Sequence, residues 1–330
     1  MGRLLVIAGT SGPFADFGTF APAINDRGAV AFQATRRNGA TGVFCGDGGP
    51  ITCLHQTAAY RSHPDINDAG ELCAYADLPD GREALLVGKP GQRPDAIAPD
   101  TLPAIGPLGP TMNETGAVAF RGTTAQSGPG IYVADGDRLT TVAAAGAGRF
   151  SGFEGLPVIL ADGRVVFRAD RGPHRHSIHL WAPDGRERIV AETGDRFSEL
   201  GRFPHANARG DVVFDARPQQ GRAGIFRARE GEITPVVDTT AGFEEFRGAL
   251  VDDAGRVVFY ATPTGGTLAI HRSENGVHAR VVGLGDELAG SPIIDLALNP
   301  VSFNNTGQIA LRLKLADGRQ FIARLDVFES

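Results

Sequence analysis

The stretch Ile24–Ala34, which reads I-N-D-R-G-A-V-A-F-Q-A, recurs six more times along the chain. The other copies are Ile66–Ala76, Met112–Gly122, Ile159–Ala169, Ala206–Ala216, Val251–Ala261 and Phe303–Leu313. Their turn glycines are Gly28, Gly70, Gly116, Gly163, Gly210, Gly255 and Gly307. A strand-rich repeat with a period of about 40–50 residues is typical of a propeller blade. The sequence therefore predicts an all-β, seven-bladed β-propeller that forms one domain over residues 1–330.

Each copy belongs to a longer pattern of four short strands, which predicts a four-stranded antiparallel blade. In the first repeat we expect an inner strand over Phe20–Ile24, followed by a tight turn at Asn25–Gly28. Asparagine, aspartate and glycine accept the positive φ angles that such turns need. The next strands are expected at Ala29–Ala34, Gly42–Cys45 and Ile51–His55.

The last repeat is one strand short. After Gln320–Leu325 only five residues remain, whereas the surplus segment Arg3–Ala8 precedes the first repeat and resembles an outer strand. We expect residues 1–10 to supply the outer strand of the last blade and so to close the ring. Closure would remove the open sheet edges that favour aggregation.

Composition excludes several classes of partner. The net charge is −6, with 32 Lys+Arg against 38 Asp+Glu and no basic tract, so a nucleic-acid partner is not expected. No apolar run is long enough for a signal-peptide core or a membrane span. Cys45, Cys53 and Cys73 are interpreted as small buried residues in a reducing compartment. These features favour a soluble, cytoplasmic monomer without a membrane partner.

The segments N-D-R-G-A-V-A-F-Q-A (Asn25–Ala34) and N-E-T-G-A-V-A-F-R-G (Asn113–Gly122) resemble the bacterial tandem-repeat propeller family with the motif N-x-x-G-x-V-A-F-x-A. Many members of that family look exported and anchored, and this chain shows neither signal. The chain is also similar, more weakly, to the propeller part of the cyanobacterial enzymes that alkylate aromatic rings in building cyclophanes. That resemblance implies an enzyme, although the calcium-binding repeats of those enzymes are absent here.

A ring of polar side chains is predicted five residues past each turn glycine, at the top of the second strand. The seven residues are Gln33, Tyr75, Arg121, Arg168, Asp215, Tyr260 and Arg312. Guanidinium groups suit a carboxylate, phosphate or enolate, aspartate transfers protons, and tyrosine can donate to a developing oxyanion. We expect four of them, from blades 3 to 6, to share one cavity on the top face. The alternative is that these residues pair between blades.

A second polar set is predicted on the inner strands, two residues before each turn. It contains Asp65, Thr111 and His205, and His63 begins the same strand in the second repeat. A histidine and a carboxylate are common acid–base partners in catalysis. The alternative is that these side chains are solvated by water in the channel.

Motifs for cofactors and metals are weak in this sequence. His174–His179 is the one histidine cluster, but no cysteine or acidic partner has metal-ligand spacing. Phosphate-binding loops, a G-x-S-x-G motif and a dinucleotide-binding motif are missing. We therefore expect neither a metal nor another cofactor.

These patterns favour a cofactor-independent enzyme of small-molecule metabolism acting on an anionic or polarised substrate. The expected chemistry is bond formation, cyclisation or elimination, as in a cyclase, a lyase or an alkylating transferase. The expected catalytic residues are Arg121, Arg168, Asp215, Tyr75, Tyr260, Arg312 and His205, with substrate binding by Gln33, His63, Asp65 and Thr111. The alternative is a non-catalytic propeller that binds a peptide, a glycan or a protein on the same face.

Overall fold

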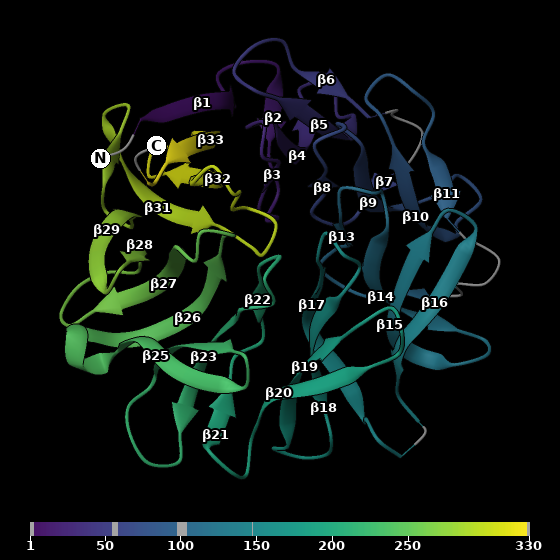
Figure 1. Ribbon diagram of the computed structural model, residues 1–330. Helices are drawn as coiled ribbons and strands as arrows, with labels where there is room; N and C mark the ends of the chain where they lie inside the picture. Colours follow the sequence, from purple (N-terminus) through teal and green to yellow (C-terminus); the bar gives the residue numbers. More distant parts are fainter. Residues whose placement is uncertain (1–2, 55–58, 98–103, 147, 329–330) are drawn as a thin grey trace.

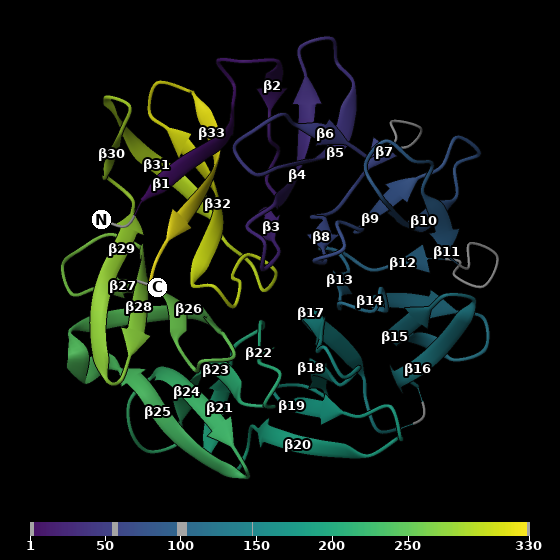
Figure 2. The ribbon, with the colours of Figure 1, turned by 45° about the horizontal axis from the view of Figure 1, so that its top comes forward.

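Seven antiparallel sheets stand around a central axis in the computed structural model, which describes residues 3–54, 59–97, 104–146 and 148–328. The sheets follow one another around the ring in chain order (Figure 1). This arrangement confirms the seven-bladed, all-β propeller predicted from the repeats. Tilting the ring shows the inner strands of the blades lining its axis (Figure 2).

In blades 1 to 3 the inner strand is split into two short pieces. Blade 1 comprises β2 (Phe14–Asp16), β3 (Ala23–Ile24), β4 (Val30–Arg36), β5 (Thr41–Gly46) and β6 (Thr52–Cys53). Blade 2 comprises β7 (Ala59–Tyr60), β8 (Asp65–Ile66), β9 (Leu72–Asp77), β10 (Glu83–Gly88) and β11 (Asp95–Ile97). Blade 3 comprises β12 (Ala104–Ile105), β13 (Thr111–Met112), β14 (Val118–Thr124), β15 (Gly128–Asp135) and β16 (Arg138–Ala144).

Blades 4 to 7 keep the same order of strands. Blade 4 comprises β17 (Gly152–Ile159), β18 (Val165–Asp170), β19 (His176–Trp181) and β20 (Glu187–Glu192). Blade 5 comprises β21 (Phe197–Leu200), β22 (His205–Ala206), β23 (Val212–Pro218), β24 (Gly224–Arg229) and β25 (Glu232–Asp238), followed by the 3₁₀ turn η1 (Thr239–Ala241). Blade 6 comprises β26 (Phe243–Val251), β27 (Val257–Pro263), β28 (Ala269–Glu274) and β29 (Val277–Gly283). Blade 7 comprises β30 (Glu287–Leu288), β31 (Ser291–Ala297), β32 (Gln308–Leu315), β33 (Gln320–Asp326) and β1 (Leu4–Gly9).

The ring closes through its N-terminal strand, as predicted. Strand β1 pairs antiparallel with β33, from Leu4 opposite Leu325 to Gly9 opposite Phe321. Ile7 and Ala8 are buried beneath this pairing. The two ends of the chain therefore build one blade, and their strands lie side by side in Figure 1.

The split in the inner strand was not predicted. In blade 1, β2 pairs with the far end of β4, β3 pairs with its beginning, and the residues between them bulge away. In blade 4 the strand is continuous, but its register shifts between Glu154 and Val158. Below we call this interruption the bulge. It divides each blade into a turn half, next to the repeated glycine turn, and a top half beyond the bulge.

The repeated asparagine in the turn explains why the motif recurs. Asn25 accepts the N–H of Ala29 on its side-chain oxygen, which closes its own turn, and donates its amide to the carbonyl of Asn67 in the next blade. Asn304 donates in the same way to Asn25 and so links blade 7 to blade 1. Gly28 completes the turn with a φ of 79°, which favours glycine. One residue type thus builds the turn and joins neighbouring blades.

The core lies between blades and within each sheet. Phe14, Phe32 and Phe44 pack edge to face or stacked inside blade 1, with ring centroids 4.9–5.9 Å apart. Alternate side chains of each sheet pack against the next blade, as when Tyr75 joins Phe120 in one apolar cluster. Cys73 is fully buried, and Cys45 and Cys53 are half-buried. Across the described ranges, no helix is long and apolar enough to span a membrane.

Candidate functional site

The seven predicted polar side chains lie in the middle of their strands. Strand β4 continues to Arg36, two residues beyond its expected end, so Gln33 stands beside the bulge rather than at the top. Arg121 is likewise in the middle of β14. The predicted position at the top face is therefore wrong. These side chains lie at mid-height of the blades, because the inner strands and the second strands both continue beyond the bulge.

Two of these side chains, Gln33 and Arg121, reach along the ring to the next blade. Side chains project from the faces of a sheet, and each blade turns its faces toward its neighbours. Gln33 donates to the carbonyl of Tyr60 in blade 2, at 2.6 Å, and Arg121 donates to the carbonyl of Gly155 in blade 4, at 3.3 Å. These two hydrogen bonds join neighbouring blades, whereas the ion pairs of Arg168 and Arg312 lie within their own blades.

The four residues expected to share one cavity have different surroundings. Arg121 lines a cavity of about 240 Å³ at the edge of blades 3 and 4, and Tyr260 lines another of about 110 Å³ with Leu298 of blade 7. Arg168 is buried and pairs with Glu154 at 2.6 Å. The structure thus corrects the expected shared cavity, because Arg121 and Tyr260 line separate cavities and Arg168 is paired within its own blade.

The same residue type has different partners in different blades. Arg312 pairs with Asp295 at 2.8 Å, as Arg168 pairs with Glu154. In blade 3 the inner strand instead places Gly106 beside Arg121, and the Gly106 N–H donates to the Arg121 carbonyl. Because Gly106 has no side chain where blade 4 has Glu154, Arg121 forms no ion pair with any carboxylate of the described residues.

Two further groups with an unpartnered polar atom flank the bulge of blade 3, which spans residues 106–110. A methyl group placed on Gly109 would lie 2.6 Å from Nε2 of His63, and that nitrogen has no hydrogen-bond partner. Tyr75 packs against Ile105, and its hydroxyl makes no close hydrogen bond either, although the backbone of Arg121 lies near enough to oppose the rise of its pKa. Arg121 contacts the same bulge, since its Cβ would lie 2.7 Å from a methyl group on Gly106. We call His63, Tyr75 and Arg121 the bulge cluster.

The three residues of the bulge cluster have pKa values that burial shifts in different ways. Burial lowers the pKa of His63 to about 4, so its imidazole is neutral at neutral pH. Burial raises the pKa of Tyr75, and its phenol keeps the proton. Burial also lowers the pKa of Arg121, while the charges of Tyr75, Glu154 and Asp170 oppose that shift. The cluster therefore holds a proton acceptor, a proton donor and a cation.

The cavity beside Arg121 owes its space to glycine. Its lining residues are Ile105, Gly106, Arg121, Gly122, Thr123, Pro129, Gly130, Gly152 and Phe153. A methyl group on Gly152 would meet only Asp170, at 3.6 Å, so this wall has room for a side chain. Gly152 is therefore a place where the cavity can be filled without disturbing the sheet.

Arg168 and Asp215 belong to an ionic group at blades 4 and 5. Arg168 also lies 3.3 Å from Asp170, whose carboxylate contacts Nδ1 of His176 at 2.7 Å. Burial raises the pKa of Asp215 to about 6, and the charge of Arg168 partly opposes this shift. The structure thus brings these two predicted residues near each other, beside a carboxylate–histidine pair that the sequence did not indicate.

The predicted inner-strand residues line a cavity of about 190 Å³ in the channel, on the side of the repeated turns. Their side chains are used by the backbone of the next blade. Asp65 accepts the N–H of Met112, Thr111 that of Ile159, and His205 that of Val251. Burial raises the pKa of Asp65 to about 7 and lowers that of His205 to about 4. These contacts join blades, and nothing in them indicates catalysis.

Blade 4 contains a serine–histidine–glutamate row that sequence reasoning missed. Ser177 Oγ lies 2.7 Å from His179 Nε2, and His179 Nδ1 lies 2.5 Å from Glu187. The order matches a hydrolase triad. Ser177 and His179 are, however, fully buried, and His179 stacks on Phe167 where Phe44 stacks on Phe32 in blade 1. We interpret the row as packing, and aligning the repeats would have revealed it.

The histidine segment 174–179 does not form a metal centre with its neighbours. His176 contacts Asp170, and His179 contacts Ser177 and Glu187. Within the ranges described, no three His, Cys, Asp or Glu side chains lie close enough together to hold a metal ion.

The repeats identify the family. The model of a family of unknown function, DUF7453, matches residues 5–198 and again residues 112–291, which together cover most of the chain. The chain belongs to DUF7453. The two overlapping matches fit a DUF7453 protein built from repeats, since one model can align in more than one register along a ring. None of the curated proteins compared with the sequence matches it.

Solved structures similar to this DUF7453 protein are propellers. An oligogalacturonate lyase from Vibrio parahaemolyticus has a TM-score of 0.63 at 12% identity, and the likeness covers 99% of each chain. The β-propeller domain of the Trilobed protease from Pyrococcus furiosus has a TM-score of 0.62 at 13% identity, over 94% of this chain and 97% of that domain. An ulvan lyase of polysaccharide lyase family PL25, bound to a glucuronate–sulfated rhamnose unit, has a TM-score of 0.54 at 11% identity, over 98% and 94%. At such identities the likeness shows the fold alone.

Proposed function

We propose that this protein is a lyase that cleaves a uronate-containing glycan by β-elimination at the bulge cluster. The observation that carries the proposal is the meeting of three groups at one bulge: His63 and Tyr75, each with an unpartnered polar atom, and Arg121 without an ion pair. A buried polar group without a partner costs about 1–3 kcal/mol, so such groups need an explanation. Two of the similar propellers are lyases of acidic glycans.

Each group of the bulge cluster has a role in the elimination. Arg121 binds the uronate carboxylate and thereby makes the adjacent C–H more acidic. The neutral imidazole of His63 takes that proton. The phenol of Tyr75 gives its proton to the glycosidic oxygen as the C–O bond breaks and a C=C bond forms. The reaction consumes no water and needs no oxidant.

Substrate entry requires the bulge to move, because His63 and Tyr75 are each only 3% exposed. Two of the five bulge residues are glycine, and Leu108 has a φ of 81°, which is uncommon outside glycine. A strained and glycine-rich segment is a suitable place for such a movement. The cavity beside Arg121 is the space into which a sugar ring would extend.

The test is an elimination assay with polygalacturonate and other uronate polysaccharides. Elimination makes an unsaturated uronate that absorbs ultraviolet light, whereas hydrolysis does not. Arg121→Ala should lower kcat/KM by about tenfold to a hundredfold, as expected for one lost charge-assisted hydrogen bond. Arg319→Ala is the control, because Arg319 lies in blade 7, where it pairs with Asp317 and the Ala289 carbonyl and lies over the Phe321 ring. A lack of unsaturated product from all substrates, or full activity of Arg121→Ala, would reject the proposal.

A non-catalytic ring that binds a glycan, peptide or protein is the second candidate. The engagement of Gln33, Arg168 and Arg312 in contacts within and between blades favours it, since a binding scaffold needs a rigid ring rather than free acid–base groups. It would be supported by saturable glycan binding without any product. The resemblance to cyclophane-forming enzymes, and with it cyclisation, stays a prediction.

A further inference from the structure

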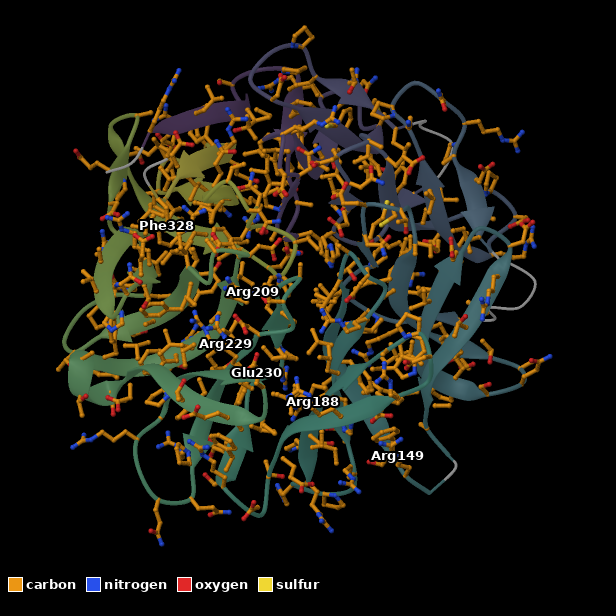
Figure 3. The ribbon with its side chains drawn as sticks, viewed as in Figure 1. Arg149, Arg188, Arg209, Arg229, Glu230 and Phe328 are labelled. Carbon is orange, nitrogen blue, oxygen red and sulfur yellow. The ribbon has the colours of Figure 1, made fainter. Side chains whose placement is uncertain are left out.

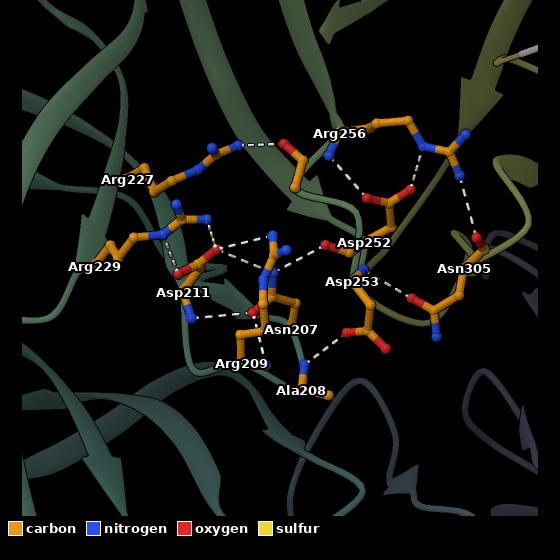
Figure 4. A network of polar contacts seen from close by, with 11 residues as sticks. Asn207, Ala208, Arg209, Asp211, Arg227, Arg229, Asp252, Asp253, Arg256 and Asn305 are labelled. Atoms are coloured by element: carbon orange, nitrogen blue, oxygen red, sulfur yellow. Dashed lines mark hydrogen bonds and ion pairs between the residues drawn. The ribbon is translucent and has the colours of Figure 1, made fainter. Parts of the chain in front are cut away.

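Three arginine side chains converge on one glycine at the turn of blade 6. A methyl group placed on Gly255 would lie 2.8 Å from Nη2 of Arg209, 3.7 Å from Nη1 of Arg227 and 3.9 Å from Nη2 of Arg229. Figure 4 shows the three side chains reaching this turn from blade 5. We call Arg209, Arg227 and Arg229 the arginine cluster.

Among the residues that the structure describes, one carboxylate contacts the arginine cluster. Asp211, which is 2% exposed, accepts both hydrogen bonds of Arg229, at 2.8 and 2.6 Å, and lies 3.3 Å from Arg209. Arg227 donates to the carbonyl of Gly255, and its Nε has no hydrogen-bond partner. Three guanidinium groups thus share one carboxylate in direct contact, while Asp252 acts on Arg227 and Glu230 acts on Arg229 from further away.

The fold does not need three arginines at such a turn. In blade 1 a single arginine, Arg324, donates to the carbonyl of Gly28. In blade 5 Arg164 alone donates to the carbonyl of Ala208, and in blade 7 Arg256 donates to that of Asn305. Arg227 fills the equivalent role in blade 6. Arg209 and Arg229 therefore add charge beyond what the turn uses.

A cavity of about 320 Å³ lies against two members of the arginine cluster, Arg227 and Arg229, and is not lined by Arg209. Arg227 and Arg229 form one wall, and Glu230 and Glu232, exposed at the hairpin between β24 and β25, lie at the other. Figure 3 shows Arg209, Arg229 and Glu230 near one another on this part of the ring. The carboxylates at the edge disfavour a long polyanion, so the cavity suits a single compact anionic group.

We propose that the arginine cluster binds a phosphate or sulfate group. Guanidinium groups form forked, charge-assisted hydrogen bonds, and a tetrahedral oxyanion can accept them from three directions at once. The ligand supplies acceptors that Asp211 alone cannot give to three guanidinium groups. This site lies in the turn half of blades 5 and 6 and shares no residue with the bulge cluster, so it does not depend on the proposed elimination.

Calorimetric titration tests the site with inorganic phosphate, sulfate, glucose 6-phosphate and acetate as probes. One molecule of phosphate or sulfate should bind per chain, and planar acetate should bind more weakly. Tighter binding of glucose 6-phosphate than of phosphate identifies a sugar ester as the source of the group. Equal or weaker binding identifies the free ion. Binding of none of the four probes overturns the proposal.

Two variants make the titration specific. Arg209→Gln removes a side chain that is 47% exposed and whose contact with Asp211, at 3.3 Å, is longer than the contacts from Arg229. The fold should therefore persist, and the affinity for phosphate should fall about tenfold. Arg209→Lys keeps the charge without the fork and should bind with intermediate affinity. Arg164→Gln is the matched control at a turn with one arginine and should bind like wild type. Unchanged affinity in Arg209→Gln, or an equal loss in Arg164→Gln, would reject the site.

Discussion

The turn half and the top half of each blade belong to the same strands, but they differ in how they repeat. In the turn half one contact recurs, as when Asn25 and Asn304 each donate to the following blade. In the top half the equivalent positions hold Arg121 without an ion pair and Arg168 bound to Glu154. Repetition therefore marks the part that assembles the ring, and variation marks the part where blades acquire separate roles.

The largest expected effect comes from opening the ring. Deleting residues 1–11 removes β1 and exposes the edge of β33. The loss of its backbone hydrogen bonds and of buried Ile7 should lower the free energy of unfolding by roughly 5 kcal/mol. Denaturant unfolding of both forms measures this. Asn304→Ala removes one link to blade 1 and the acceptor for the Gln308 N–H in its own turn, and it should cost about 2 kcal/mol. An unchanged midpoint after the deletion would show that the termini do not close the ring.

The features that could be predicted from the sequence lie mainly in the turn half. The turn motif revealed the number of blades because its glycine, present in all seven copies, takes a backbone conformation that each turn requires, and five copies also have the asparagine that closes the turn. The short strand Phe14–Asp16 gave no signal, because three residues show no periodicity. The direction of Arg121 depends on how the blades face one another, and its lack of an ion pair depends on Gly106, which the repeat pattern does not single out. The composition of the bulge cluster was therefore predictable, but its geometry was not.

A second prediction concerns acid in the turn half. Burial holds the pKa of His205 at about 4, below the 6.5 of an exposed histidine, so only the unfolded chain binds a proton between these values. This contribution to stability is complete above pH 6.5 and is lost as the pH falls toward 4. It amounts to about 3 kcal/mol over that range.

The variant His205→Asn isolates this contribution. The amide oxygen of asparagine can accept the N–H of Val251, as Nδ1 of His205 does, but it does not titrate. Unfolding measured from pH 7 to pH 4 should therefore show a shallower loss of stability in the variant. His63 and His271, with similarly lowered pKa values, still titrate in both proteins. Parallel pH profiles would mean that His205 is not kept neutral in the folded state.

The smallest expected effect concerns a difference between blades 4 and 1, and it tests whether that difference serves catalysis or only packing. Blade 4 has Ser177 and His179 where blade 1 has Gly42 and Phe44. In blade 1 the phenylalanine ring lies 3.1 Å from where a methyl group on Gly42 would stand, so the large ring needs glycine two residues before it. His179→Phe alone should therefore crowd Ser177 and cost about 1–2 kcal/mol. The double variant Ser177→Gly, His179→Phe should be close to wild type, with a coupling energy of about 1–2 kcal/mol.

The same double variant decides between packing and catalysis in blade 4. Glu187 keeps both hydrogen bonds from Arg149 after His179 is replaced, so no buried carboxylate is left without a partner. If the row only packs the blade, the elimination activity proposed for the bulge cluster should be unchanged in the double variant. A stable double variant without that activity would place the reaction in blade 4 and not at Arg121. If the stability losses of the two single variants instead add up to that of the double variant, Ser177 and His179 are not coupled in packing.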